Sequence, residues 1–66
     1  MKRFTVIVEG KCEPSGQEYI IYAETPAAAK KKAVKRFSQD DCLEYYDYLD
    51  IEVKGKNGTK FFTQDI

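Results

Sequence analysis

The sequence predicts a small α+β domain in which one helix packs on one face of a four-stranded antiparallel sheet, in the order ββαββ. Three observations predict this fold. Residues 4–9 and 17–24 are rich in β-branched and aromatic residues, and a period of two places Phe4, Val6 and Val8 on one face of the first segment and Tyr19, Ile21 and Ala23 on one face of the second, which is typical of strands. Residues 27–37 are rich in alanine and lysine and place apolar side chains four apart, as helices do. The period of two then returns and carries a hairpin signal, Asn57-Gly58.

The whole chain, residues 1–66, is expected to form a single domain, because a chain of this length leaves no room for a second. Its content of 42% hydrophobic residues is typical of a compact fold rather than a disordered segment. A turn containing Pro14-Ser15-Gly16 separates the first two strands. The order of the strands in the sheet is left open by these patterns. The predicted core comprises Phe4, Val6, Val8, Tyr19, Ile21, Ala23, Ala29, Ala33, Val34, Phe37, Leu49, Ile51, Val53 and Phe62.

The predicted helix begins with a recognisable cap. Thr25 is a good N-cap residue, and Pro26 suits the first helical position because its missing N–H would have no partner there. The helix is expected to cover residues 27–37 and to lie close to the sheet through a stripe of small and apolar side chains. Residues 38–41 indicate either its end or the cap of a further short turn. The stripe comprises Ala29, Ala33 and Phe37, with Val34 beside it.

The second hairpin is predicted from Tyr46 onwards. A two-residue type I′ turn at Asn57-Gly58 would pair Val53 with Phe62, Ile51 with Gln64 and Lys54 with Phe61. A longer loop that starts at Gly55 would shift this register. Alternation places Leu49, Ile51 and Val53 on the helix side, and Tyr46, Tyr48, Asp50, Glu52 and Lys54 on the opposite side.

The composition argues against catalysis and against metal or cofactor binding. The chain has no histidine, which removes the commonest general base, and no glycine-rich phosphate loop. Two cysteines, Cys12 and Cys42, are too few for a zinc site or a disulfide-rich secreted scaffold, so we expect free thiols in a reducing cytoplasm, with a Cys12–Cys42 disulfide as the alternative. We therefore predict no enzyme activity, no cofactor and no metal, and the absence of a long apolar stretch predicts no membrane insertion.

Three surfaces are candidates for binding. The helix carries five cations between Lys30 and Arg36, which either contact phosphates or acidic protein surfaces or simply form a solvated face. Residues 40–52 are rich in acids and tyrosine and would either bind cations or neutralise the basic helix. Aromatic side chains on the outer sheet face would either form an interface or stabilise cross-strand pairs. The predicted binding residues are Lys30, Lys31, Lys35 and Arg36 on the helix and Tyr22, Tyr48 and Phe61 on the sheet.

The passage YAETPAAAKKKA at residues 22–33 resembles a pattern in small phage and mobile-element proteins. In these proteins a hairpin leads through an Ala-Glu-Ser/Thr step into a Lys/Ala helix and then into a second hairpin. Some small anti-CRISPR proteins that bind type I surveillance complexes are similar in length, opening strand and this passage. The resemblance implies a phage-type accessory protein that binds a host macromolecular machine and blocks or redirects it.

These observations together predict a non-enzymatic protein that binds and inhibits or redirects a host protein or ribonucleoprotein complex in the cytoplasm, as a monomer or homodimer. The alternative is a small nucleic-acid-binding module that uses the basic helix and the sheet-face tyrosines. The net charge of zero argues against wholesale non-specific binding of nucleic acid. A third possibility is a minimal enzyme or redox protein that uses Cys12 and Cys42.

Overall fold

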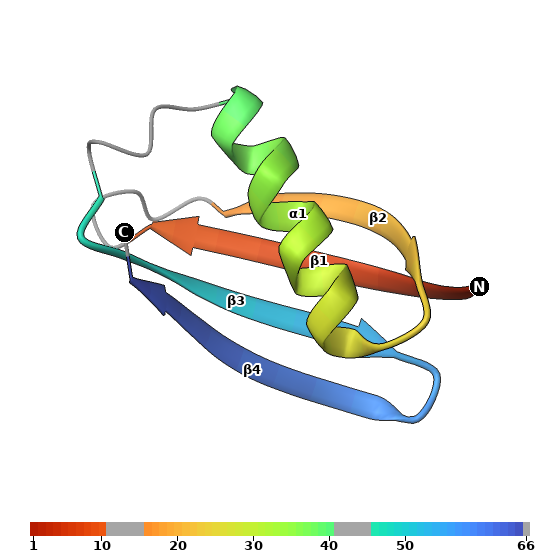
Figure 1. Ribbon diagram of the computed structural model, residues 1–66. Helices are drawn as coiled ribbons and strands as arrows, with labels where there is room; N and C mark the ends of the chain where they lie inside the picture. The colour runs from red at the N-terminus through yellow and green to blue at the C-terminus, as the bar shows by residue number, and fades with distance from the viewer. Residues whose placement is uncertain (11–15, 41–45, 66) are drawn as a thin grey trace.

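The computed structural model describes residues 1–10, 16–40 and 46–65 and has the predicted ββαββ order (Figure 1). The predicted α+β fold is confirmed. The turn at residues 14–16 falls largely outside the described residues, and Cys12 and Cys42 fall wholly outside them. The elements are β1 (Lys2–Gly10), β2 (Gln17–Ala23), α1 (Pro26–Asp40), β3 (Tyr48–Gly55) and β4 (Gly58–Asp65).

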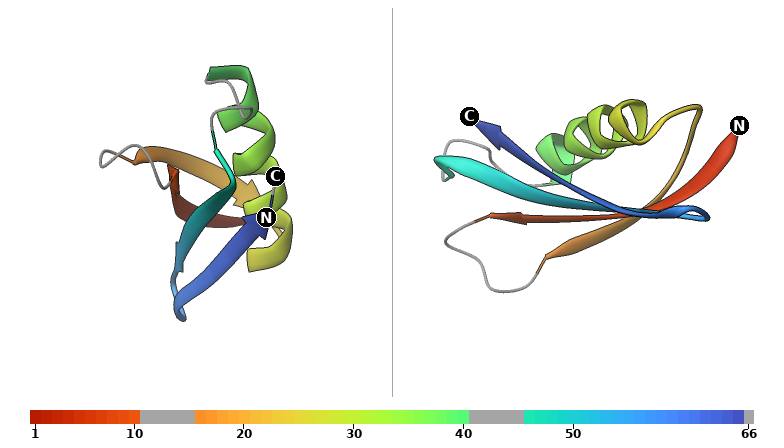
Figure 2. Two further views of the ribbon diagram at one scale, coloured as in Figure 1. Left: turned by 90° about the vertical axis from the view of Figure 1, so that its left-hand side faces the viewer. Right: turned by 90° about the horizontal axis from the view of Figure 1, so that it is seen from below.

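The four strands form one antiparallel sheet in the order β2-β1-β3-β4. The strands β1 and β3 lie at the centre, so the first strand of the chain pairs with β2 on one side and with β3 on the other. The strands β2 and β4 form the two edges. The helix α1 lies on one face of the twisted sheet and contacts β2, β1 and β3 (Figures 1 and 2).

The core lies between α1 and the inner face of the sheet. The side chains of Val6, Val8 and Leu49 on the two central strands are completely buried, as are Ala29 and Ala33 on the helix. Each large apolar side chain buried in this way stabilises the fold by about 1.5–3 kcal/mol. The predicted core is confirmed except at its margin, since Val34 and Phe62 are only partly buried.

The helix begins as predicted and extends beyond the predicted range 27–37 into residues 38–41, where the sequence indicated its end. Thr25 Oγ1 accepts a hydrogen bond from the Ala28 N–H at 3.2 Å, so Thr25 is the N-cap, and Pro26 is the first helical residue. The helix covers Pro26–Asp40, so it ends within residues 38–41. Near this end the Tyr19 hydroxyl on β2 donates a hydrogen bond to Asp40 Oδ2 at 2.9 Å.

Tyr46 belongs to the core, which corrects the prediction that it lies on the outer face. It precedes β3, and a bend at Asp47 breaks the alternation before the strand begins. The Tyr46 side chain is only 5% exposed and packs on Phe37, with the ring centroids 5.7 Å apart. A Cβ atom at Gly10 would overlap this ring, so the close approach requires glycine there.

The β3–β4 turn is formed by Lys56 and Asn57, one residue earlier than predicted. The predicted pairings of Val53 with Phe62, Ile51 with Gln64 and Lys54 with Phe61 are wrong, since Val53 pairs with Lys60, Ile51 with Phe62 and Lys54 with Thr59. In the described ranges, only Gly58 has a positive φ, 133°, so Asn57 does not adopt the conformation that a type I′ turn requires. The register shifts by two residues, which leaves every side chain of β4 on its expected face.

Candidate functional site at the basic end of the sheet

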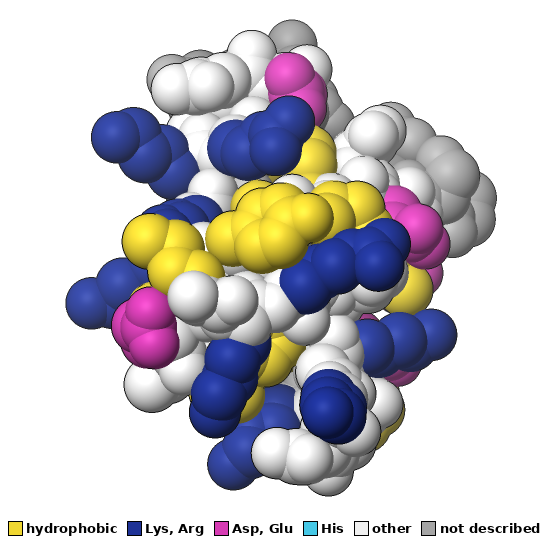
Figure 3. All heavy atoms as spheres, turned by 90° about the vertical axis from the view of Figure 1, so that its right-hand side faces the viewer, with side chains coloured by type: hydrophobic (Ala, Val, Ile, Leu, Met, Phe, Trp, Pro, Cys, Tyr) yellow, Lys and Arg dark blue, Asp and Glu magenta, His cyan; other side chains and the backbone are white. Residues whose placement is uncertain are grey.

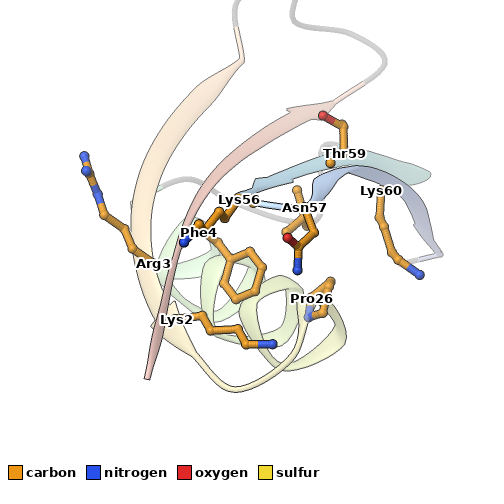
Figure 4. A pocket seen from close by; sticks show the side chains of 11 residues that line it. Lys2, Arg3, Phe4, Pro26, Lys56, Asn57, Thr59 and Lys60 are labelled. Atoms are coloured by element: carbon orange, nitrogen blue, oxygen red, sulfur yellow. The ribbon is translucent and has the colours of Figure 1, made fainter.

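A pocket of about 660 Å³ lies on the helix side of the sheet, between the start of α1 and the tip of the β3–β4 hairpin (Figure 4). Its apolar surface comes from Phe4, Val53 and Pro26, which belong to three different elements. Figure 4 shows the Phe4 ring, Pro26 and the Asn57 side chain arranged around the hollow. The remaining lining residues are Lys2, Arg3, Gly55, Lys56, Gly58, Thr59 and Lys60.

The pocket is strongly basic. Lys2 reaches it from β1, Lys56 from the turn and Lys60 from β4, and all three side chains are exposed. Arg3 also borders the pocket, but its side chain points away from the hollow, towards the outer face of the sheet (Figure 4). The lining residues include no carboxylate. Figure 3 shows this end of the molecule, where lysine and arginine side chains surround apolar surface and the acidic side chains in view lie towards the edges. The arrangement suits a ligand that combines negative charge with an apolar body.

The cations of α1 do not form one continuous cluster. Lys30 lies over the Phe62 ring on β4, with Nζ 5.8 Å from the centroid. Arg36 lies over the Tyr19 ring on β2, with Cζ 5.3 Å from the centroid, and Lys32 Nζ donates to the Tyr22 carbonyl oxygen at 2.7 Å. The predicted binding residues Lys30, Lys31, Lys35 and Arg36 therefore point in three directions, with exposed Lys31 and Lys35 on the solvent side of the helix.

The predicted aromatic residues of the outer face also lie apart. Tyr22 is 56% exposed on β2 and faces Arg3, whereas Phe61 is 75% exposed on β4 and faces Glu52. Tyr48 is partly buried at the other end of β3, where it faces Asp65. The structure therefore does not bring Tyr22, Tyr48 and Phe61 together into one aromatic patch.

Acidic side chains occupy the middle of the outer face instead. A hollow of about 320 Å³ there is lined in part by Glu9, Asp50 and Glu52, together with Ile7 and Phe61. Glu52 pairs with Lys54 on the same strand at 3.3 Å, and the Thr63 hydroxyl donates to Asp50 Oδ1 at 3.4 Å. The net charge of zero thus conceals a separation between an acidic outer face and a basic end.

Sequence reasoning missed the pocket because its cations come from distant parts of the chain. Lys2 and Lys60 are adjacent to one site only because β1, β3 and β4 lie side by side. The lysines that flank the hairpin signal, Lys56 and Lys60, were a local indication of positive charge at the tip. The position of β1 next to β3 was not predictable from that indication.

The described residues show no metal-binding cluster: no group of three or more His, Cys, Asp or Glu side chains is suitably placed. In the same part of the chain, no helix is long and apolar enough to cross a membrane. Comparison with protein-family models, with curated proteins and with solved structures found no match of any of the three kinds.

Proposed function

We propose that this chain is a non-enzymatic binding protein that attaches through its basic end to an anionic surface of a host protein or ribonucleoprotein complex and inhibits or redirects that complex. The observation that carries the proposal is the pocket at the tip of the sheet, where three lysines from β1, the hairpin turn and β4 lie around an apolar floor and no carboxylate contributes. The inhibitory role is supported by the resemblance of residues 22–33 to small phage accessory proteins.

The physical argument concerns the number of cations and the rigidity of their supports. One exposed ion pair contributes about 0–1 kcal/mol, so no single lysine would hold a partner. Lys2 and Lys60 are on strands of one sheet, so the backbone positions from which their side chains extend are fixed before binding. The fields of neighbouring cations add and steer an anionic partner towards the pocket, although each flexible side chain loses rotamer freedom when it is immobilised.

Charge reversal separates the pocket from the helix surface. The variant Lys56→Glu with Lys60→Glu changes the pocket, whereas Lys31→Glu with Lys35→Glu makes the same charge change at exposed helix positions. We expect the pocket variant to bind the captured host complex about tenfold more weakly, which corresponds to about 1.4 kcal/mol, and the helix variant to bind almost normally. Affinity capture from host extract with each folded variant, followed by titration of the purified complex, measures this difference.

Two results would contradict the pocket assignment. Full binding by the Lys56/Lys60 variant together with loss of binding by the Lys31/Lys35 variant would place the interface on the helix, as the sequence suggested. Loss of binding only in the variant Tyr22→Ser, Tyr48→Ser and Phe61→Ser would place the interface on the outer sheet face. Circular dichroism of every variant shows whether it remains folded.

A nucleic-acid-binding module is the second candidate, and the absence of carboxylates from the pocket lining favours it. Several cations spread across one end can contact successive phosphates, and release of counterions would then make binding steeply dependent on salt. Titration of labelled single- and double-stranded DNA and RNA at two salt concentrations tests this candidate. Tight binding by the isolated protein that weakens steeply with salt would support it, and weak binding would leave a protein surface as the target.

A further inference from the structure

The two edges of the sheet differ in how they are protected. The edge strand β2 lies beside side chains of α1, because Lys32 Nζ donates to the backbone oxygen of Tyr22 at 2.7 Å and Arg36 covers the Tyr19 ring. The Tyr19 hydroxyl is bonded to Asp40 at the end of the same helix. A strand approaching this edge would have to displace these side chains.

The opposite edge is less protected. Lys30 of α1 lies over the Phe62 ring on β4, with Nζ 5.8 Å from the centroid, but among the described residues no hydrogen bond ties β4 to the helix as Tyr19 and Tyr22 tie β2. The strand β4 pairs with β3 along its whole length, Gly58–Asp65, and within the described chain no segment runs beside its outer edge (Figures 1 and 2). It contains no proline and no bulge that would disturb pairing, and Phe61 is 75% exposed. An exposed edge strand of this length and composition is a template for pairing with another strand.

We propose that β4 pairs with β4 of a second copy of this chain and forms a two-fold symmetric, continuous eight-stranded sheet. The argument is self-complementarity. A two-fold axis perpendicular to the sheet keeps every side chain on its own face, and residues that pair across two strands must share a face. Pairing centred on Phe62 meets this condition. A register shifted by one residue would oppose side chains from different faces and is excluded. In this register Lys60 faces Gln64 of the other copy, Thr59 faces Asp65, and no like charges are opposed.

The pairing accounts for the exposed groups of β4. It places the partly buried Phe62 against its own counterpart and Phe61 against Thr63, so that apolar surface at the middle of the strand leaves water. Because the paired strands are antiparallel, the two hairpin tips and their basic pockets lie at opposite ends of the extended sheet, on the same face. The proposal does not depend on what the pocket binds.

Charge at residue 64 tests both the edge and the register. Gln64→Lys places a second lysine opposite Lys60 at both ends of the symmetric pair, and we expect the dissociation constant of the dimer to rise about tenfold. Lys60→Glu combined with Gln64→Lys creates two opposite-charge pairs and is expected to restore the wild-type constant. The matched control is Gln17→Lys, the same substitution on the same face of the protected edge strand β2, which should have no effect.

The measurement is sedimentation equilibrium under reducing conditions over a wide range of protein concentration, with circular dichroism to confirm folding. The expected result is a wild-type mass that rises with concentration from 7.6 kDa to twice that value. A wild-type protein that stays monomeric at every concentration would overturn the proposal. Weakening by Gln17→Lys but not by Gln64→Lys would move the contact to β2, and failure of the charge-swapped variant to restore association would refute this register.

Discussion

At the scale of single residues, Gly10 allows a close contact at one end of the core. Gly10 is buried at the end of β1, and the Tyr46 ring lies where a Cβ atom of residue 10 would be. The same ring packs on Phe37 near the end of α1. One close approach therefore links the first strand, the helix and the segment that leads into β3.

We expect Gly10→Ala to lower the free energy of unfolding by about 1–3 kcal/mol, because the added methyl group forces the Tyr46 ring out of its place. Urea denaturation followed by circular dichroism measures the change. The control is the same substitution in a Tyr46→Leu background, where a smaller side chain leaves room and the cost should fall below about 1 kcal/mol. An equal cost in both backgrounds would show that the ring is not the cause.

At the scale of elements, α1 is fixed at both of its ends by contacts that differ in kind. The Thr25 cap at the first turn is local in sequence. The Tyr19–Asp40 hydrogen bond at the last turn joins the helix to an edge strand. The first contact stabilises the start of α1 near the hairpin tip, and the second joins its last turn to the edge strand β2.

Thr25→Ala is expected to destabilise the protein by about 1 kcal/mol, because the Ala28 N–H loses its acceptor at the helix start. Thr25→Ser keeps a hydroxyl at the same position and should cost much less. Thermal or urea unfolding of the two variants compares them directly. Similar losses in both would indicate that the methyl group of Thr25, and not its hydroxyl, stabilises this turn.

Tyr19→Phe is expected to cost about 0.5–1.5 kcal/mol, since it removes one partly buried hydrogen bond and leaves the core-facing ring in place. Amide hydrogen exchange should show faster opening of the last turn of α1, while the first turn stays unchanged. An Asp40→Asn variant completes a double-mutant cycle with Tyr19→Phe. Strictly additive effects of the two changes would argue against a direct interaction between them.

The elements were predictable where local chemistry determines them. The strands and the start of α1 follow from alternation, capping and the apolar stripe, all of which involve neighbouring residues. Residues 38–41 indicated the end of α1, but the Tyr19–Asp40 hydrogen bond at that end was not predictable, because Tyr19 lies far away in the sequence. The hairpin register was also missed, since a shift of two residues leaves the inner and outer faces of β4 unchanged and so gives no signal in the hydrophobic pattern.

At the scale of the whole molecule, the strand order β2-β1-β3-β4 creates the candidate site. It brings the first residues of β1 beside the β3–β4 hairpin, so that Lys2, Lys56 and Lys60 meet at one end although the sequence separates them. Alternation and composition carry no information about strand order. The prediction therefore placed the binding site on the helix, where the cations are close together in the sequence. The structure turns those cations in three directions, and Lys30, Lys32 and Arg36 contact other parts of the fold.

The basic end should be dispensable for stability. Lys56 and Lys60 are exposed and contribute cations around a hollow rather than contacts within the core, so the charge-reversed pair should change the free energy of unfolding by less than about 0.5 kcal/mol. Urea denaturation at moderate ionic strength checks this expectation. A large loss of stability would mean that weakened binding by this variant reports unfolding and not the surface.

The central position of β1 also makes the second hairpin necessary for the core. Without β3 and β4, one side of β1 lacks its partner strand and the sheet beneath α1 is incomplete. Pairing of β1 with β3 joins residues that are 39 to 49 positions apart in the sequence, and closing so long a loop costs entropy before any contact compensates for it. We therefore expect the pairing of β1 with the β3–β4 hairpin to be a late step of folding.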